Sequence, residues 1–263
     1  MIRKILIQSL IVAVTLLTAI CSYGQKQAIQ VYSSRNIFTF NFMFGQQFPL
    51  ADLKERFGSC PTVGVSVAYK TPSNWQFEAG LSSFYGSRVK ENTMFDSLTG
   101  PSGDLIDANG QLAVIRLYER GFHVFAGGGR LFNFGNNNQN SGLLLTGGLG
   151  FMQHKIKFTY FKDILPQLDK DMYKGYDRLT NGLMLRQWVG YQRMDPHQRF
   201  NFFVGFEILE GFTKNRRSLN YDTRVRDNRN RLDMTLSFKV GISIALYGNM
   251  GKKNKVLEEK FFD

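Results

Sequence analysis

The alternation of apolar and polar positions is the strongest pattern in the chain. From Leu232 to Leu246 every second residue is apolar, and the residues between them are polar or small. A period of two places the two kinds of side chain on opposite faces of a β-strand. The run is longer than the roughly 5–6 residues of a soluble strand and long enough for the about 9–11 residues that cross a bilayer. It predicts a membrane-spanning strand; the alternative is a long strand in a soluble sandwich.

The same alternation recurs along the chain. It is clear in Phe38–Phe44, Val63–Tyr69, Trp75–Leu81 and Phe202–Ile208. Weaker alternation marks five further segments: Gln111–Tyr118, Phe122–Phe132, Gly142–Phe151, Lys155–Phe161 and Leu183–Tyr191. With the last strand, these segments predict about ten strands, within a range of about 8–12.

The connections between these segments alternate between short and long. Short turns are expected at Thr71–Asn74, Glu119–Gly121, Met152–His154 and Asp195–Gln198. Long connections are expected at Gln46–Pro61, Gly86–Gly110, Asn133–Ser141, Lys162–Asn181 and Lys214–Asn230. Bacterial outer-membrane barrels have short periplasmic turns and longer outer loops. We therefore expect an all-β, closed antiparallel transmembrane barrel with both ends in the periplasm, because an open sheet edge is not tolerated in hydrocarbon.

The two ends of the chain differ from this central region. Arg3 and Lys4 precede an apolar stretch, and small residues follow at Ser22 and Gly24. This arrangement predicts a signal peptide over residues 1–24. A lipoprotein cleaved before Cys21 is the alternative, although the bulky Ile20 is unusual before a lipidated cysteine. We expect the barrel to span residues 25–247 and a polar periplasmic tail to span residues 248–263.

Composition supports strands over helices. The chain has 24 Phe, 11 Tyr and 26 Gly but only 6 Pro, and aromatic residues are enriched in strands and in membrane-interface girdles. Beyond the signal peptide no apolar run reaches the roughly 20 residues that a membrane-spanning helix requires. Cleavage would leave Cys60 without a partner for an intramolecular disulfide.

Charged residues on the polar faces of the strands predict a lumen charge network. It comprises Glu78, Arg116, Arg186, Glu207, Asp233 and Lys239. Buried charges persist when they are paired, so we expect these residues to fill the lumen as a structural plug. The alternative is that they line a selective pore.

The histidines argue against catalysis. Enzymes built on small outer-membrane barrels place a histidine with acidic or hydroxyl groups at the outer rim, since histidine moves protons near neutral pH. His154 and His197 fall in predicted inner turns, and His123 lies near the inner end of a predicted strand. We therefore expect no catalytic residues and no enzyme. No cysteine or histidine pair has zinc-ligand spacing, and we expect no metal and no cofactor.

Two outer loops are candidate contact surfaces. The first contains seven basic residues: Lys214, Arg216, Arg217, Arg224, Arg226, Arg229 and Arg231. Arginine suits phosphate geometry, which predicts contact with lipopolysaccharide or a protein; nucleic acid is not expected. The alternative is a solvated loop paired with Asp96, Asp104 and Asp107. The second loop contains a possible lid or docking segment: Tyr173, Tyr176, Asp177 and Arg178.

Three segments carry a resemblance to a known group. They are the Gln25 start of the mature chain, Phe48–Gly58 after the first strand, and the turn Lys70–Trp75. In these the chain resembles the small outer-membrane β-barrel proteins of Bacteroidota. The resemblance implies a multi-pass protein of the outer membrane, and a role as an accessory subunit of an envelope machine such as the type IX secretion apparatus or the barrel-assembly machinery. A narrow uptake channel is the alternative, followed by an outer-membrane hydrolase.

Overall fold

The structure is a computed structural model that describes residues 32–100, 105–106, 109–113, 115–134, 138–160, 170–195 and 199–248. The predicted signal peptide and all of the predicted tail except Gly248 lie outside these residues. Among the described residues, no helix is both long and apolar enough to cross a membrane.

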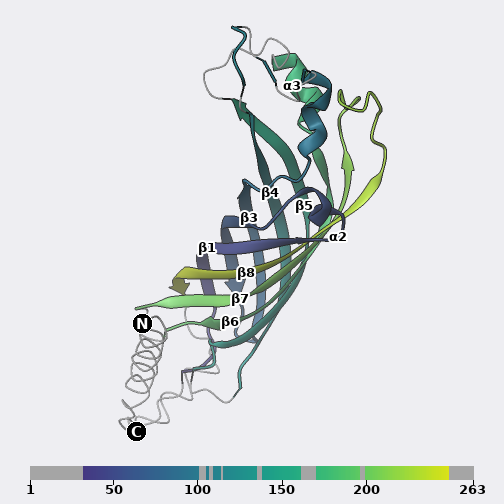
Figure 1. Cartoon of the computed structure of the whole chain (residues 1–263). Coiled ribbons are helices and arrows are strands. Elements are labelled where there is room, and N and C mark those ends of the chain that lie inside the picture. Colours follow the sequence, from purple (N-terminus) through teal and green to yellow (C-terminus); the bar gives the residue numbers. More distant parts are fainter. Residues whose placement is uncertain are drawn as a thin grey trace, which may run out of the picture.

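Eight antiparallel strands form a closed barrel (Figure 1). They are β1 (Ile37–Leu50), β2 (Cys60–Lys70), β3 (Trp75–Gly86), β4 (Ile115–Phe132), β5 (Gly142–Tyr160), β6 (Thr180–Arg193), β7 (Asn201–Asn215) and β8 (Asn230–Tyr247). Each strand pairs with the next, and β8 pairs with β1 from Ile37–Tyr247 to Leu50–Met234. The predicted closed antiparallel barrel is confirmed.

The predicted number of ten strands is wrong, because two predicted turns lie inside strands. Glu119–Gly121 is part of β4 and Met152–His154 is part of β5, and the two strands pair without a break from Ile115–Tyr160 to Phe132–Leu143. Glu119, Gly121 and His154 resemble turn residues in sequence, but here they face the lumen. A Cβ at Gly121 would lie 2.1 Å from the ring of Phe84, so the glycine leaves room for a lumen side chain.

The connection Asn133–Ser141 therefore lies at the opposite end of the barrel from the one predicted. Leu131 N–H donates to the Asn74 carbonyl at 2.8 Å, and Ser141 Oγ donates to the Met194 carbonyl at 3.2 Å. These bonds join the three short connections at one end, the turn end. The start of β1 and the end of β8 lie there as well, since Ile37 pairs with Lys70 beside the β2–β3 turn and Gly248 N–H donates to the Asn36 carbonyl.

The long connections gather at the other end of the barrel, the loop end. Three of them contain short helices: α2 (Ala51–Arg56), the 3-10 helix η1 (Asn92–Leu98) and α3 (Lys170–Tyr176). β4 and β5 extend toward this end beyond the other strands (Figure 1).

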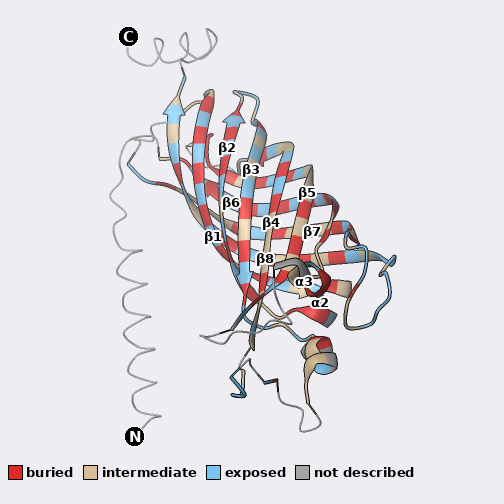
Figure 2. Cartoon of the chain, turned by 90° about the horizontal axis from the view of Figure 1, so that it is seen from above, coloured by how far each residue is buried: buried red, intermediate tan, exposed pale blue. Residues whose placement is uncertain are grey.

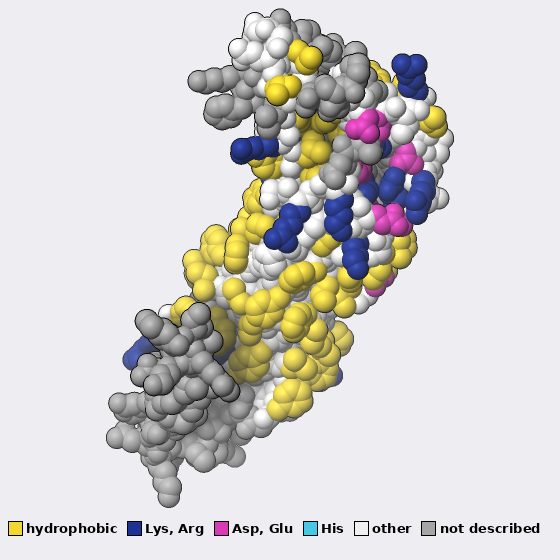
Figure 3. Space-filling view, in the orientation of Figure 1, with side chains coloured by type: hydrophobic (Ala, Val, Ile, Leu, Met, Phe, Trp, Pro, Cys, Tyr) yellow, Lys and Arg dark blue, Asp and Glu magenta, His cyan; other side chains and the backbone are white. Residues whose placement is uncertain are grey.

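Polarity is inverted relative to a water-soluble protein. On β1, Phe40, Phe42 and Phe44 face outward and are 42%, 48% and 56% exposed, whereas Thr39 and Asn41 are buried in the lumen. Exposed and buried residues alternate along the strands in Figure 2. In Figure 3 hydrophobic side chains cover the outer surface of the strands as a broad belt, and charged side chains gather toward the end that carries α3.

Candidate functional site: the polar lumen and the loop end

The centre of the lumen contains a chain of buried ion pairs. Arg186 on β6 lies between two carboxylates, 2.6 Å from Glu207 on β7 and 3.2 Å from Glu78 on β3. Lys239 on β8 forms an ion pair with Glu207. The guanidinium of Arg186 also lies 3.9 Å from the centroid of the Phe125 ring. Four strands are thus linked across the barrel interior by charge.

A second group of polar side chains lies in the lumen, and it includes Asp233, another residue of the predicted charge network. Its Oδ2 is 2.8 Å from His154 Nε2 and accepts a hydrogen bond from Thr213 Oγ1. His154 and Asp233 are fully buried, and the ring of Phe57 packs edge-on against the imidazole at 5.6 Å.

The order of this second group does not suit nucleophilic catalysis. In a hydrolytic triad the histidine lies between the hydroxyl and the carboxylate and takes the hydroxyl proton. Here the carboxylate of Asp233 lies between Thr213 and His154. The arrangement holds a buried polar network together, and it leaves no histidine nitrogen on the hydroxyl.

Arg116 lies apart from the predicted charge network. In β4 the buried Glu119, His123 and Phe125 show that odd-numbered positions face the lumen, so Arg116 faces outward, and its side chain is exposed. The assignment failed because the predicted turn at Glu119–Gly121 hid the continuity of β4. If the alternation of inward and outward residues is continued through the whole strand, Arg116 falls on the outer face.

The structure adds lumen residues that the sequence interpretation missed. His123 and His154 face the lumen from β4 and β5 rather than occupying the inner end, and His123 Nε2 is 3.9 Å from Glu207 Oε2. Glu119 is buried near the loop end beside Cys60, which begins β2 rather than lying in a loop. His197 lies outside the described residues.

The turn end of the lumen is closed by Lys70. Its ammonium group donates to Ser34 Oγ at 2.8 Å and to Asn140 Oδ1 at 3.1 Å, and its side chain is 2% exposed. Residues before β1 and in the β4–β5 connection therefore cover the barrel opening. Between Lys70 and the ion pairs, a cavity bounded by Gln76, Arg186 and Trp188 measures about 20 Å³, which is space for about one water molecule.

The loop end is closed by a hydrophobic cluster, the outer cluster. It is made of Leu53, Phe57, Met94, Leu105, Ile156, Phe158 and Tyr176. These residues come from the β1–β2, β3–β4 and β5–β6 connections and from the extension of β5. The connections therefore pack into one structure above the lumen instead of projecting separately into solvent.

Ion pairs surround the outer cluster. Arg56 is 2.5 Å from Glu91, Arg178 pairs with Glu91 and Asp222, and Arg217 is 2.5 Å from Asp177. The hydrogen bond to Asp177 raises the pKa of the Arg217 guanidinium.

The predicted lid residues belong to this closed structure. The ring of Tyr173 stacks on Phe158 with centroids 4.2 Å apart, and Tyr176 packs edge-on against Tyr221. Asp177 is buried beneath Arg217. The segment lies over the barrel mouth and is anchored there by neighbouring connections.

The seven predicted basic contact residues divide into two groups. Arg217, Arg229 and Arg231 form ion pairs with Asp177, Asp52 and Asp227, respectively. Lys214, Arg216, Arg224 and Arg226 form no ion pair within the part of the chain that the structure describes. Asp104 and Asp107, two of the predicted acidic partners, lie outside it. Burial opposes ionisation of Asp227, but hydrogen bonds from Arg231 and the Arg229 N–H lower its pKa.

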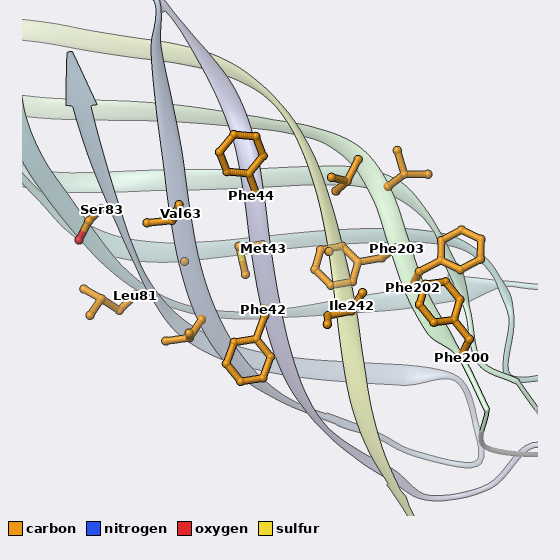
Figure 4. A pocket seen from close by; sticks show the side chains of 15 residues that line it. Phe42, Met43, Phe44, Val63, Leu81, Ser83, Phe200, Phe202, Phe203 and Ile242 are labelled. Atoms are coloured by element: carbon orange, nitrogen blue, oxygen red, sulfur yellow. The ribbon is translucent and has the colours of Figure 1, made fainter. Parts of the chain in front are cut away.

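The outer surface carries an apolar groove of about 930 Å³. It runs over β7, β8, β1, β2 and β3, and its walls include Phe42, Phe44, Phe202 and Ile242 (Figure 4). Its walls are almost entirely hydrophobic, so it offers shape but no catalytic group. Among the described residues, no group of three or more metal-ligating side chains could hold an ion.

Comparison with solved structures finds similar barrels. Ail, the attachment invasion locus protein of Yersinia pestis, solved with the heparin analogue sucrose octasulfate, is 12% identical with a TM-score of 0.44 over 80% of this chain and 99% of that chain. The outer membrane protein OprG of Pseudomonas aeruginosa is 11% identical with a TM-score of 0.39 over 83% and 99%. Neisserial surface protein A is 10% identical with a TM-score of 0.37 over 79% and 96%. The chain matches no family model and no curated protein.

Proposed function

We propose that this chain is an integral β-barrel of the bacterial outer membrane with a closed lumen, and that it acts as a structural or accessory subunit of an outer-membrane complex. The inverted polarity of the barrel carries the proposal: apolar side chains face outward and charged side chains are buried inside. Exposed apolar area costs about 25 cal/mol per Å² in water, and soluble monomers rarely expose a patch beyond a few hundred Å². A bilayer removes this cost.

The interface residues support a transmembrane placement. Tyr69, Trp75 and Tyr191 face outward near the turn end, and Tyr85 faces outward near the loop end. Aromatic residues at both limits of an apolar belt are typical of outer-membrane barrels. Since the longer connections of such barrels are extracellular, the loop end faces outward and the turn end faces the periplasm.

The closed lumen favours a structural role over a channel. The ion pairs around Arg186, the outer cluster and Lys70 occupy three successive levels of the barrel. Eight-stranded barrels have interiors that side chains can fill. An ion crossing this lumen would have to displace buried, paired charges.

An accessory role is supported by the two ends of the barrel. The packed connections at the loop end provide an ordered surface suited to protein contact, and the sequence of the predicted tail, Gly248–Asp263, contains charged residues suited to contact with a periplasmic partner. The resemblance to the small outer-membrane β-barrel proteins of Bacteroidota implies candidate partners in secretion or barrel-assembly machinery. A hydrolase is disfavoured by the order of Thr213, Asp233 and His154.

We expect the purified chain to produce no stable conductance steps in a planar bilayer, because the buried ion pairs block the lumen. Heat-modifiable migration on gels should show that the same preparation contains folded barrel. A wide porin of 16–18 strands provides the positive control. Reproducible unitary conductance from folded protein would favour the uptake channel instead.

We expect an affinity-tagged full-length chain, extracted in mild detergent from its own host, to co-purify with a specific outer-membrane or periplasmic protein. Quantitative mass spectrometry against an untagged strain measures the enrichment. The same chain ending at Gly248 is the matched variant and should lose a periplasmic partner while still folding. A monodisperse barrel without any enriched protein would contradict the accessory role.

A further inference from the structure

A row of outward-facing basic residues lies next to the apolar belt at the loop end. We call it the basic collar: Arg116 and Arg120 on β4, Lys155 and Lys157 on β5, and Lys214 and Arg216 at the end of β7. Four of these were absent from the basic residues that the sequence singled out for phosphate contact.

The position of the collar follows from strand geometry. On β4 and β7 the next outward positions toward the turn end are aromatic, Phe122 and Phe212, and Phe212 is 57% exposed. On β5 the next outward position is Gln153, and Phe151 follows it. Side chains two residues apart on a strand lie on the same face. The collar therefore begins where the hydrophobic belt ends, at the level of lipid headgroups in the proposed orientation.

Among the residues that the structure describes, the collar has no ion-pair partner. Within the described ranges, none of its residues forms an ion pair with a carboxylate. Arg120 lies over the rings of Tyr85 and Tyr118, at 5.5 and 5.2 Å. Arg216 donates to the amide oxygen of Asn181 at 2.6 Å. These contacts orient the two side chains, and no carboxylate of the described residues pairs with their charges.

The register adds an independent observation. Arg120 lies directly opposite Lys155 in the β4–β5 pair, and like charges at opposed positions destabilise a sheet. Other arginines at the loop end, such as Arg178 and Arg217, pair with carboxylates. The opposed charges of Arg120 and Lys155 destabilise the isolated protein, and an anion bound between them from outside the protein would compensate both.

We propose that the basic collar binds the phosphate groups of anionic lipid headgroups in the outer leaflet. The proposal rests on the membrane placement given under Proposed function. Arginine forks and lysine ammonium groups both bind phosphate, and the aromatic rings of Tyr85 and Tyr118 suit the same interfacial layer. Arg224, Arg226 and Arg229, at the far side of the β7–β8 connection, are not part of the collar.

The test uses two charge-matched triple variants of the full chain. The collar variant is Arg116→Gln, Lys155→Gln, Lys157→Gln; the loop variant is Arg224→Gln, Arg226→Gln, Arg229→Gln. Each protein is reconstituted in phosphatidylcholine nanodiscs with and without lipid A, and bound lipid A is measured by native mass spectrometry. A basic residue near an anionic surface contributes about a five-fold change in affinity. We expect the collar variant to lose about 100-fold and the loop variant to change little.

Each outcome decides between stated alternatives. Equal losses of lipid A affinity in both variants would overturn the proposal that the collar binds lipid phosphate. The same holds if the folded parent protein shows no preference for lipid A over phosphatidylcholine. Displacement of lipid A by an equal concentration of inorganic phosphate would assign the collar to free phosphate and overturn the lipid proposal. Failure of the parent protein to insert into any bilayer would instead overturn the proposed membrane placement.

A stability measurement guards against misfolding of the collar variant. In neutral detergent the single change Lys155→Gln removes the like charge opposite Arg120, so this variant should resist urea at least as well as the parent. Added lipid A should stabilise the parent more than this variant. A destabilised Lys155→Gln protein in detergent would show that Lys155 has a structural role and would count against the proposal.

Discussion

Replacing Glu207 with Gln should cause one of the two largest losses of stability in this barrel. Glu207 is fully buried and pairs with both Arg186 and Lys239. The amide cannot compensate two buried cations, and breaking a buried ion pair from one side costs about 3–5 kcal/mol. Urea unfolding of the protein in detergent micelles, followed by tryptophan fluorescence, measures the change in the free energy of unfolding.

Glu210→Gln is the matched control for this prediction. Glu210 lies on the same strand but faces outward, where it accepts a hydrogen bond from Gln187 at 3.1 Å. Its neutralisation removes no buried ion pair, and the new amide can still accept that bond. The protein should therefore be as stable as the parent or slightly more stable. Equal unfolding midpoints for Glu207→Gln and Glu210→Gln would show that the lumen charges do not stabilise the barrel.

Phe57→Ala should destabilise the loop end by a comparable amount. The ring is fully buried in the outer cluster, packs edge-on against His154, and lies 5.1 Å from the guanidinium of Arg56. Truncating a buried phenylalanine to alanine typically costs about 3–5 kcal/mol because a cavity remains. Because Phe57 belongs to the cover of the lumen, its loss should also speed hydrogen exchange of the β1–β2 and β3–β4 connections.

Val225→Ala provides the comparison for Phe57. Val225 is an apolar residue in the β7–β8 connection and is 62% exposed, so its truncation should change the free energy of unfolding by no more than about 0.5 kcal/mol. If Phe57→Ala matched this small effect and left hydrogen exchange at the loop end unchanged, the connections would not form a cooperative cover.

The chemistry of the lumen could be read in part from single strands. Glu78, Glu207 and Lys239 alternate with apolar neighbours inside clear period-two runs, so the polar face of each strand was evident without a structure. Which of these side chains contact one another was not evident from the sequence, because the contacts join residues far apart in the chain. Arg186 reaches Glu78 from a strand that is three places along the barrel.

The two long central strands, β4 and β5, could not be predicted from the pattern of apolar and polar residues. The stretch around Gly127–Gly129 and Gly147–Gly148 carries no side chains that mark an inner and an outer face. Polar lumen residues such as Glu119 and His154 then resembled turn signals. Two strands were read as four, Arg116 was assigned to the lumen, and the histidines to the inner end. The continuous pairing of β4 with β5 corrects all three predictions. A single register along both strands determines which residues face the lumen and which face outward.

By itself, the sequence determined that this chain forms a barrel of long alternating strands, because period-two alternation is a property of neighbouring residues and needs no tertiary contact. Tertiary structure alone decided that there are eight strands, that His154 meets Asp233, and that three connections join in the outer cluster. These features depend on register and barrel closure, which bring together groups that no local pattern relates. The basic collar belongs to both levels: its charges are visible in the sequence, but only the paired strands place them on one outward face.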